Sequence, residues 1–489
     1  MDTGWETIAL FSVDWLIRLG LIVRVILRKQ PGSAGLAWIM TLLLLPLAGG
    51  VLYLTIGENR QGRERTERAA AIHDRYQAHL ASLRERAVVN WAALPPASER
   101  IGLQIEHEVG MPAQAGHELT LMHDSVDMLR AIAGDIRAAR HSCLLEFYIW
   151  SEGGVADDVA LALMETAGRG VDCHVLVDAV GSKHFMKSQW PARLREAGVE
   201  LVEALPVRPG RFQFARADLR THRKIAVIDS TIAYTGSLNI ADPGLFKQDA
   251  GVGHWVDTMV RFAGPTVESL EVTFRVDWEL ATGEQLPPLP EPLRAIAFRA
   301  EGITPPHGET VQAAPSGPGV APEAVHALLL TTIYLARREL VLTTPYFVPD
   351  ESMIIALTSA ARRGVDVTLV VPEKVNSKLV ALASRSFFVD LLEAGVKVVE
   401  YEAGLLHSKT ATIDGEISLI GSANLDMRSF WINFEITLAV YGEHFTASVR
   451  SLQAAYIARS RPLTAESLAG VSWSRRLAQS TARLVGPLL

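Results

Sequence analysis

Two copies of one polar pattern stand out in the sequence, and their residue types suit chemistry at phosphorus. In each copy a lysine follows a histidine by two residues, an aspartate follows the lysine by five, and Gly-Ser-x-Asn comes after six more residues. The first copy consists of His222, Lys224, Asp229, Ser237 and Asn239, and the second consists of His407, Lys409, Asp414, Ser422 and Asn424. A match at six positions, found twice, is too specific to arise by chance.

A histidine, an ammonium group, a hydroxyl and an amide, each supplied twice, fit a displacement at phosphorus. Such a reaction needs mainly charge stabilisation around a phosphorus atom whose entering and leaving oxygens are in line. One imidazole can attack phosphorus while the other protonates the departing alkoxide, and a covalent phosphohistidine divides one difficult step into two easier ones. The sequence shows no cluster with the spacing of metal ligands. We therefore expect no metal or other cofactor, with the two lysines supplying the positive charge.

Each copy predicts a β-hairpin that presents these side chains together. In the first copy, apolar runs at 225–228 and 232–235 flank a short turn, and in the second the turn is Asp-Gly. Side chains two apart on a strand share a face, so each histidine should project with its lysine, and each serine with its asparagine. The aspartates, Asp229 and Asp414, have the opposite parity and lie at the turns. We therefore expect them to brace the hairpins rather than to face a substrate.

The polar pattern belongs to a longer internal repeat. Arg-Gly-Val-Asp occurs at 169–172 and again at 363–366, and Glu-Ala-Gly-Val occurs at 196–199 and 393–396. Each half alternates helices with apolar strands before its hairpin, which predicts an α/β sheet covered on both faces. Because one phosphorus must lie between two histidines, the halves should face each other about a pseudo-two-fold axis.

The N-terminal region predicts a transmembrane helical hairpin over residues 1–58. Residues 35–56 carry no charged side chain, a run long enough to span a bilayer. The apolar stretch at 7–27 contains Asp14 and Arg18, which lie one helical turn apart and can neutralise each other. A cleaved signal peptide is the alternative for this first stretch, but its start is acidic and no small-residue cleavage site follows. Basic residues after the second stretch slightly favour a cytoplasmic location for the rest of the chain.

Composition sets the other predicted boundaries. Residues 59–114 are charged and should form a helical connector, 115–286 the first domain, and 323–489 the second domain with a C-terminal tail. The Pro- and Gly-rich segment 287–322 reads as the linker between the domains. The tail, 474–489, mixes arginines with apolar residues, so it either docks on its own domain or lies on an anionic membrane surface.

The net charge argues against one class of function, nucleic-acid cleavage, whereas the cysteine content is less informative. The net charge is −7, whereas a nuclease needs a basic surface for the phosphate backbone, so we expect no nucleic-acid partner. The two cysteines, Cys143 and Cys173, fall in apolar strand-like runs and are expected to be buried small side chains. Two such residues do not identify a redox compartment.

The duplicated pattern resembles the HKD motif of the phospholipase D superfamily, and the resemblance extends from about residue 115 to 460. Within that superfamily the chain is most similar to bacterial cardiolipin synthases. The similar segments are 145–150, 316–318, 344–349 and Trp38 in an apolar run that ends at Gly57-Glu58. The resemblance implies two similar phospholipase D-like α/β/α sandwich domains whose motifs meet in a single active site.

The resemblance also implies roles for the matched residues. The implied catalytic residues are His222, Lys224, Asp229, His407, Lys409 and Asp414, and the implied substrate phosphate-binding residues are Ser237, Asn239, Ser422 and Asn424. An acidic residue downstream of each motif should orient a histidine, and Asp257 and Glu435 hold these places. Asp257 lies 21 residues after Gly236, whereas Glu435 lies 14 residues after Gly421, so the first match is the looser one.

The implied activity is that of a membrane-bound phosphatidyltransferase, which makes cardiolipin and glycerol from two phosphatidylglycerol molecules through a phosphatidyl-histidine. We assign His222 as nucleophile and His407 as general acid and then base, although the pseudo-symmetry permits the reverse. A phospholipase D-type hydrolase and a transferase that uses another alcohol are the alternatives, because the alcohol pocket has no motif. A tethered nuclease and a non-enzymatic scaffold fit less well.

The expected partners are phosphatidylglycerol and membrane lipid. The expected location is the bacterial inner (cytoplasmic) membrane, with a multi-pass topology. The oligomeric state stays open.

Overall fold

The structure is a computed structural model, and it describes residues 3–28, 32–45, 47–57, 63–86, 89–206, 218–287, 308–319 and 321–484. The chain divides into two compact units. The first consists of residues 1–67 with 207–219, and the second consists of 68–206 with 220–489.

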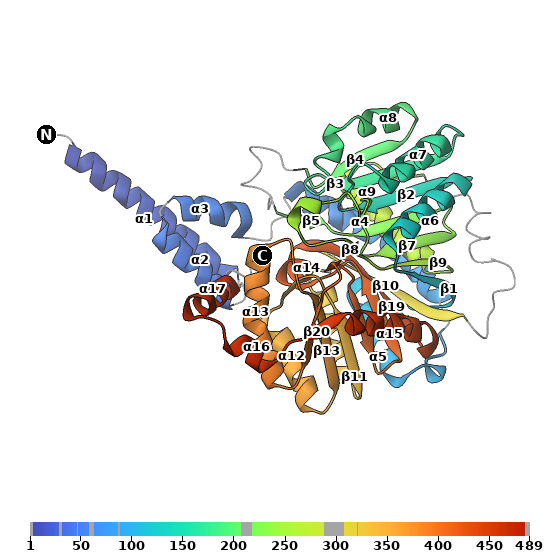
Figure 1. Cartoon of the computed structure of the whole chain (residues 1–489). Helices are drawn as coiled ribbons and strands as arrows, with labels where there is room; N and C mark the ends of the chain where they lie inside the picture. The colour runs from blue at the N-terminus through green and yellow to red at the C-terminus, as the bar shows by residue number, and fades with distance from the viewer. Residues whose placement is uncertain are drawn as a thin grey trace. The chain divides into compact units, whose positions relative to one another are not determined.

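The N-terminal unit contains a helical hairpin. It consists of α1 (Thr3–Leu27), α2 (Gly32–Leu44), α3 (Ala48–Leu52) and a π-helical turn (Tyr53–Gly57), drawn in dark blue in Figure 1. A small apolar core that includes Val25, Trp38 and Tyr53 joins these helices. Arg18 of α1 forms an ion pair with Asp14, as predicted, and also donates to the carbonyl oxygen of Leu43 at 3.1 Å.

The single helix predicted over 35–56 is wrong. Helix α2 ends at Leu44 and α3 begins at Ala48. Leu45 precedes a proline, whose ring disfavours a helical conformation at the preceding residue and whose nitrogen donates no hydrogen bond. Within the described ranges, no helix combines the length and the apolar character needed to cross a membrane.

Among the described residues of the second unit, 16 strands form one mixed sheet, and each half of the repeat supplies the strands at one end of the strand order. The strands of the first half are β1 (Gln114–Met122), β2 (Ser142–Phe147), β3 (Asp172–Asp178), β4 (Glu200–Ala204), β5 (Arg220–Thr221), β6 (Lys224–Ile228), β7 (Ile232–Gly236) and β9 (Met259–Ala263). Those of the second half are β10 (Glu309–Ser316), β11 (Glu339–Thr343), β13 (Asp366–Pro372), β14 (Lys397–Tyr401), β16 (Thr410–Ile413), β17 (Ile417–Gly421), β19 (Asn433–Tyr441) and β20 (Ser460–Pro462).

The strand order shows the predicted repeat. The order β1-β9-β7-β6-β2-β3-β4 in the first half corresponds to β10-β19-β17-β16-β11-β13-β14 in the second, and antiparallel pairing of β1 with β10 joins the two. Strand β10 lies inside the predicted linker 287–322. The Gly and Pro content of that segment suggested a loop, but its residues 309–316 pair along β19 in register, and backbone pairing with a buried strand outweighs composition.

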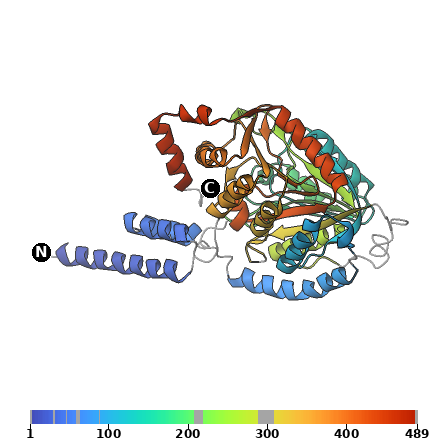
Figure 2. The same ribbon diagram turned by 90° about the horizontal axis from the view of Figure 1, so that it is seen from below.

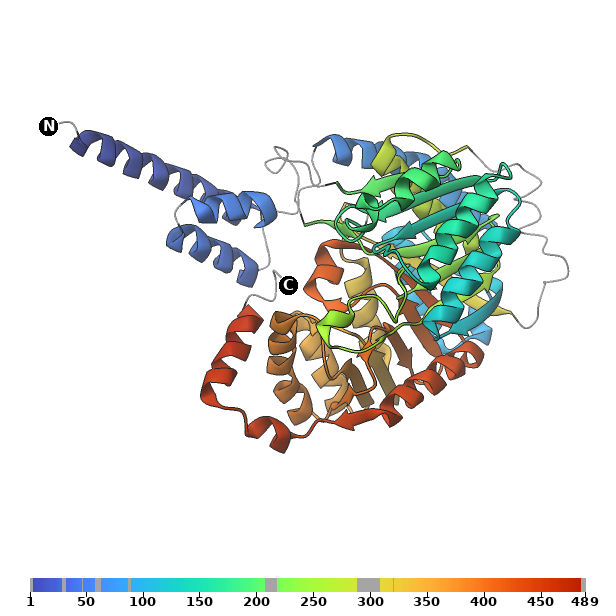
Figure 3. The same cartoon turned by 45° about the horizontal axis from the view of Figure 1, so that its top comes forward.

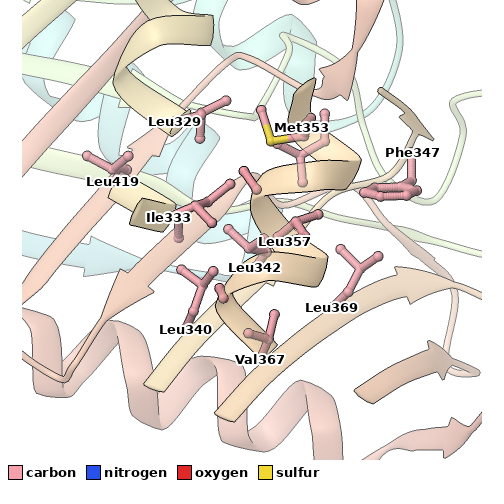
Figure 4. Close-up of a cluster of buried hydrophobic side chains, with 14 of the residues drawn as sticks. Leu329, Ile333, Leu340, Leu342, Phe347, Met353, Leu357, Val367, Leu369 and Leu419 are labelled. Carbon is pink, nitrogen blue, oxygen red and sulfur yellow. The ribbon is translucent and has the colours of Figure 1, made fainter. Parts of the chain in front are cut away.

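Helices cover both faces of this sheet, which confirms the predicted α/β/α arrangement (Figures 2 and 3). On one face lie α6 (Ser125–Ala138), α7 (Val155–Ala167), α8 (Trp190–Glu196), α11 (Ala324–Leu335), α12 (Glu351–Arg362) and α13 (Lys378–Glu393). On the other face lie α9 (Val267–Thr282) and α15 (Glu443–Ala458). Figure 4 shows the apolar side chains of α11 and α12 meeting those of β11 and β13.

The cysteines, the connector and the tail were also predicted from the sequence. Cys143 and Cys173 are buried thiols, as expected, and the structure places them opposite each other on β2 and β3. The predicted connector 59–114 contains α4 (Arg63–Arg86) and α5 (Pro96–Val109). The described part of the tail lies in α17 (Trp473–Leu484), and residues 485–489 lie outside the described residues. Helix α17 docks on α13 with an ion pair of 3.2 Å between Arg483 and Asp390, while Trp473, Leu477 and Leu484 stay exposed.

Candidate active site

The two polar patterns form the predicted hairpins. Strands β6 and β7 pair from Ile225 to Thr235, and β16 and β17 pair from Thr410 to Ile420. In the first hairpin Asp229 and Ser230 both have positive φ angles, 49° and 53°, as a tight turn between twisted strands requires. The second turn is built in the same way from Asp414, with φ 56°, and a glycine.

The turn aspartates act as braces and do not lie with the other polar residues of their motifs. The Asp229 carboxylate accepts the backbone N–H groups of residues 140–142, at 2.8 to 2.9 Å. The Asp414 carboxylate accepts those of residues 337–339. Each carboxylate therefore ties its hairpin to the start of a neighbouring strand. These contacts match the bracing role expected from the positions of the two aspartates, and the catalytic role that the resemblance implied for Asp229 and Asp414 stays a prediction.

Each histidine lies against an acidic side chain from the other half. His222 Nδ1 lies 2.9 Å from a carboxylate oxygen of Glu435, and His407 Nδ1 lies 2.6 Å from one of Asp257. These are the two acids that the sequence suggested. Their exchange between the halves brings both copies of the pattern into one site.

Two short parallel strand pairs cause the exchange. Strand β5 (Arg220–Thr221) pairs with the start of β19, and β8 (Trp255–Val256) pairs with β15 (Leu405–Leu406). Each pairing continues into the next residue, since His222 N–H donates to the carbonyl of Phe434 and His407 N–H donates to that of Val256, both at 2.8 Å. The backbone thereby places each histidine beside the opposite acid.

These contacts set the state of both imidazoles. A carboxylate at Nδ1 holds the proton on that nitrogen and leaves the lone pair on Nε2. The Tyr148 ring packs edge-on against His222 with centroids 5.0 Å apart, and the Trp255 ring lies 4.6 Å from His407. Burial lowers the pKa of His222 to about 4 and that of His407 to about 3. Both imidazoles are therefore neutral near pH 7 and able to accept a proton or attack an electrophile.

Both lysines are buried beside the histidines. Lys409 Nζ donates to the carbonyl oxygen of His407 at 2.6 Å, and Lys224 Nζ donates to that of His222. Burial lowers the pKa of Lys224 to about 8 and that of Lys409 to about 7. An anion that enters this site would find two ammonium groups from which water is largely excluded, where electrostatic attraction is strong.

The two acids remain ionised. Burial raises the pKa of Asp257, but His407, Lys409 and a hydroxyl donor together outweigh burial and lower it overall. The same balance, with His222 and Lys224 as the counterparts, lowers the pKa of Glu435. Each acid is thus a fixed negative charge behind its histidine.

The serines hold these acids. Ser237 donates its hydroxyl to Asp257 at 2.7 Å and accepts the Thr258 N–H at 2.9 Å. Ser422 donates to Glu435 at 2.5 Å and accepts the Ile436 N–H at 2.9 Å. The hydroxyl protons therefore point to the carboxylates, and the phosphate-binding role expected of the two serines stays a prediction.

The asparagines are held differently from each other. The Asn239 side-chain oxygen accepts the backbone N–H of Ile149 at 3.1 Å, so its NH2 group is the donor that remains. The Asn424 side-chain oxygen is buried with no hydrogen-bond partner among the described residues. Amide groups thus stay compatible with phosphate binding.

The sequence did not reveal the support beneath the first histidine. Arg223 donates to the carbonyl oxygens of Glu435, at 3.0 Å, and Ser316, at 3.1 Å, and forms an ion pair with Asp277. At the matching place in the second half, Ser408 accepts a hydrogen bond from Thr258 at 2.8 Å. The signal that could have revealed this support is an arginine between His222 and Lys224, at the start of an apolar strand.

Within the described residues, no group of His, Cys, Asp and Glu side chains could hold a metal ion.

Two models of known protein families together match most of the chain. A family model described as "Cardiolipin synthase, PLD-like domain" matches residues 132–278 and 329–454. A second, described as "Phospholipase_D-nuclease N-terminal", matches residues 17–58.

Individual relatives agree with this assignment. The chain is 42% identical over 478 residues to proteins named Cardiolipin synthase A from Yersinia pseudotuberculosis and Yersinia pestis, which covers 97% of this chain and 96% of each relative. Among solved structures, the phosphatidylserine synthase of Haemophilus influenzae is similar in fold, with a TM-score of 0.59 and 14% identity over 80% of this chain and 100% of that one.

Proposed function

The chain belongs to the cardiolipin synthase family of phospholipase D-like enzymes, and from this premise we propose that it joins two phosphatidylglycerol molecules into cardiolipin and releases glycerol. One observation carries the mechanism. Two neutral imidazoles, each backed by an ionised acid of the other half, share a buried site with two lysines. Such a site can hold one phosphodiester between a nucleophile and a proton donor.

In the first step, Nε2 of His222 attacks the phosphorus of the donor lipid, and the bond from phosphorus to the glycerol oxygen breaks. His407 takes up a proton as the negatively charged phosphodiester binds, and it gives that proton to the glycerol oxygen, so glycerol leaves neutral. Lys224 and Lys409 stabilise the negative charge on the non-bridging oxygens, and Glu435 stabilises the positive charge that develops on His222.

In the second step, neutral His407 removes a proton from a free hydroxyl of the acceptor lipid. The resulting oxygen attacks phosphorus and the bond from phosphorus to His222 breaks, which forms cardiolipin. His407 ends protonated and His222 ends neutral, which is the state in which the pair began the first step. When cardiolipin leaves, His407 releases this proton and both imidazoles are neutral again.

The test uses purified protein in detergent with phosphatidylglycerol as the only lipid. Cardiolipin and glycerol should form in equal amounts, and a His222→Ala variant should form neither. Phosphatidic acid without cardiolipin would show a hydrolase instead, and a new lipid formed only on adding another alcohol would show a different acceptor.

We also propose that residues 1–58 hold the enzyme in the bacterial inner membrane with a multi-pass topology. Helices α1 and α2 expose many large apolar side chains, among them Phe11, Leu16, Leu19, Leu36 and Leu44. Exposed apolar surface of this extent is typical of a membrane or protein contact. A lipid substrate favours the membrane.

A further inference from the structure

The first half carries a loop that the second half lacks. The stretch from Gly236 to Asp257 is seven residues longer than the stretch from Gly421 to Glu435. In the second half this shorter stretch forms β18 (Leu425–Asp426) and α14 (Met427–Trp431). In the first half residues 241–254 form a loop that leads into β8 and so towards His407.

The loop is anchored at both ends. At its start the Asp242 carboxylate accepts the N–H groups of Val155, at 2.9 Å, and Gly244, at 2.8 Å. At its end Gly253 has a φ of 76° and lies so close to Gly404 that a Cβ on Gly253 would be 3.2 Å from the Gly404 Cα. An apolar cluster of Val252, Trp255, Leu405, Phe246 and Val375 lies between these two anchors. This packing gives the loop a defined conformation.

The loop brings a third lysine close to the second histidine. The Lys247 ammonium lies 5.2 Å from the centroid of Phe246 and 5.8 Å from that of Trp255. The same Trp255 ring packs on His407 at 4.6 Å. Lys247 and His407 therefore both contact one indole ring. Lys247 forms no ion pair with any residue that the structure describes.

The surroundings of Lys247 suit an anion that arrives from outside. Partial burial lowers the pKa of this lysine, whereas nearby Asp249 acts in the opposite direction. The Trp255 indole N–H is also buried without an acceptor among the described residues. A positive charge and an unpaired donor beside the same ring leave favourable contacts that an anionic ligand could complete.

The proposed reaction involves a second anion at this place. The donor phosphate lies between Lys224 and Lys409, but the acceptor lipid carries its own phosphodiester. A three-carbon glycerol unit separates that phosphodiester from the hydroxyl that His407 must deprotonate. The acceptor phosphate must therefore lie a short distance from His407, and Lys247 is a cation in that region.

We propose that Lys247 binds the phosphodiester of the acceptor lipid and thereby holds its free hydroxyl at His407. The inference rests on the proposed function and adds a specificity determinant to it. With Lys247 in place, an anionic lipid bearing a hydroxyl competes better for the covalent intermediate than water or a neutral alcohol does.

The test compares two acceptors in one reaction. Full-length enzyme in mixed micelles receives phosphatidylglycerol together with n-butanol, and cardiolipin and phosphatidylbutanol are both measured. Lys247→Met should lower the ratio of cardiolipin to phosphatidylbutanol about tenfold or more, as expected for the loss of a charge-assisted contact. The loss should be a higher KM for the acceptor lipid, and Lys247→Arg should restore most of the ratio.

Lys397→Met is the matched control. Lys397 begins β14, at the opposite end of the strands from the site, and forms an exposed ion pair of 2.7 Å with Asp366. Its loss should leave the product ratio unchanged. The proposal is overturned if Lys247→Met leaves the ratio unchanged or lowers both products equally. Failure of the proposed function would look different, because the wild-type enzyme would then make no cardiolipin.

Discussion

At the residue scale, the site shifts its four basic side chains, the two histidines and the two lysines, towards their neutral forms. Burial lowers the pKa of both histidines and both lysines, because each positive charge is costly where water is excluded. A phosphodiester brings negative charge to this cluster. Its binding should therefore raise these pKa values and produce the protonated acid that the first step uses. The enzyme would then assemble its reactive charge state only when substrate is present.

The two histidines should be indispensable and should act as one unit. Replacing either His222 or His407 by Ala should lower turnover by about 10⁴-fold or more, and the double variant should be little worse than the single ones. Quenched wild-type reactions should contain phosphohistidine in the peptide that includes residue 222. Phosphohistidine at residue 407 instead would exchange the two proposed roles, and additive losses in the double variant would contradict the two-histidine mechanism.

The lysines should set the alkaline limit of activity. The pKa of Lys409 is lowered to about 7 and that of Lys224 to about 8, so their charged forms are present below these values and lost above them. We expect kcat/KM, which reports the free enzyme, to fall as the pH rises through about 7 to 8. The corresponding limb of kcat should lie at higher pH, because bound phosphodiester favours the ammonium form. A kcat/KM profile that stays flat above pH 8 in mixed micelles would contradict this assignment.

At the scale of the elements, two strand pairs of two residues each decide that the halves share one site. Pairing of β5 with β19 and of β8 with β15 carries Glu435 to His222 and Asp257 to His407. Neither half contains a complete pair of its own. The supports beneath the two pairs differ, since Arg223 lies under one and Ser408 under the other. This difference breaks the pseudo-symmetry and allows the two histidines to have distinct tasks.

The hairpin braces should contribute to stability more than to catalysis. Asp229→Asn and Asp414→Asn should each lower the free energy of unfolding by about 1–3 kcal/mol, because backbone N–H groups lose a charged acceptor. Thermal unfolding and the rate of the folded fraction measure the two effects separately. An Asp229 variant that melts normally but is inactive would return this residue to the catalytic group.

Local sequence patterns predicted the two hairpins, but such patterns do not predict which distant segments of the chain pair with each other. The hairpins follow from alternating apolar runs and turn residues within about 15 positions, so the sequence contains everything needed to recognise them. Which acid meets which histidine depends on contacts more than 140 residues apart, such as His407 with Asp257. The role of Arg223 and the strand β10 were missed for the same reason, since each depends on tertiary contacts.

At the scale of the whole molecule, the catalytic unit is continuous. The halves meet through β1 and β10 in one sheet, and α9 and α15 pack on a common core beneath both. The repeat in the sequence predicted two similar halves, but it could not predict that they would continue one sheet. The continuous helix predicted over 35–56 is wrong, because an uncharged run was read by length alone although the sequence has a proline at position 46.

The N-terminal unit should anchor the enzyme without contributing to its chemistry. Residues 1–58 contain none of the polar residues of the site, so a chain that begins at residue 59 should fold and make cardiolipin from lipid dispersed in detergent. Its activity on phosphatidylglycerol bilayers should fall by about tenfold or more, because an anchored enzyme meets its lipid substrate at a higher effective concentration. The measurement is activity of both forms on micelles and on vesicles, with the Lys397→Met full-length protein as the control.

Washing membranes with alkaline carbonate then tests the anchor itself. Full-length protein should stay in the pellet if the exposed apolar side chains of α1 and α2 contact lipid as proposed. Release of that protein by the wash would contradict a multi-pass anchor.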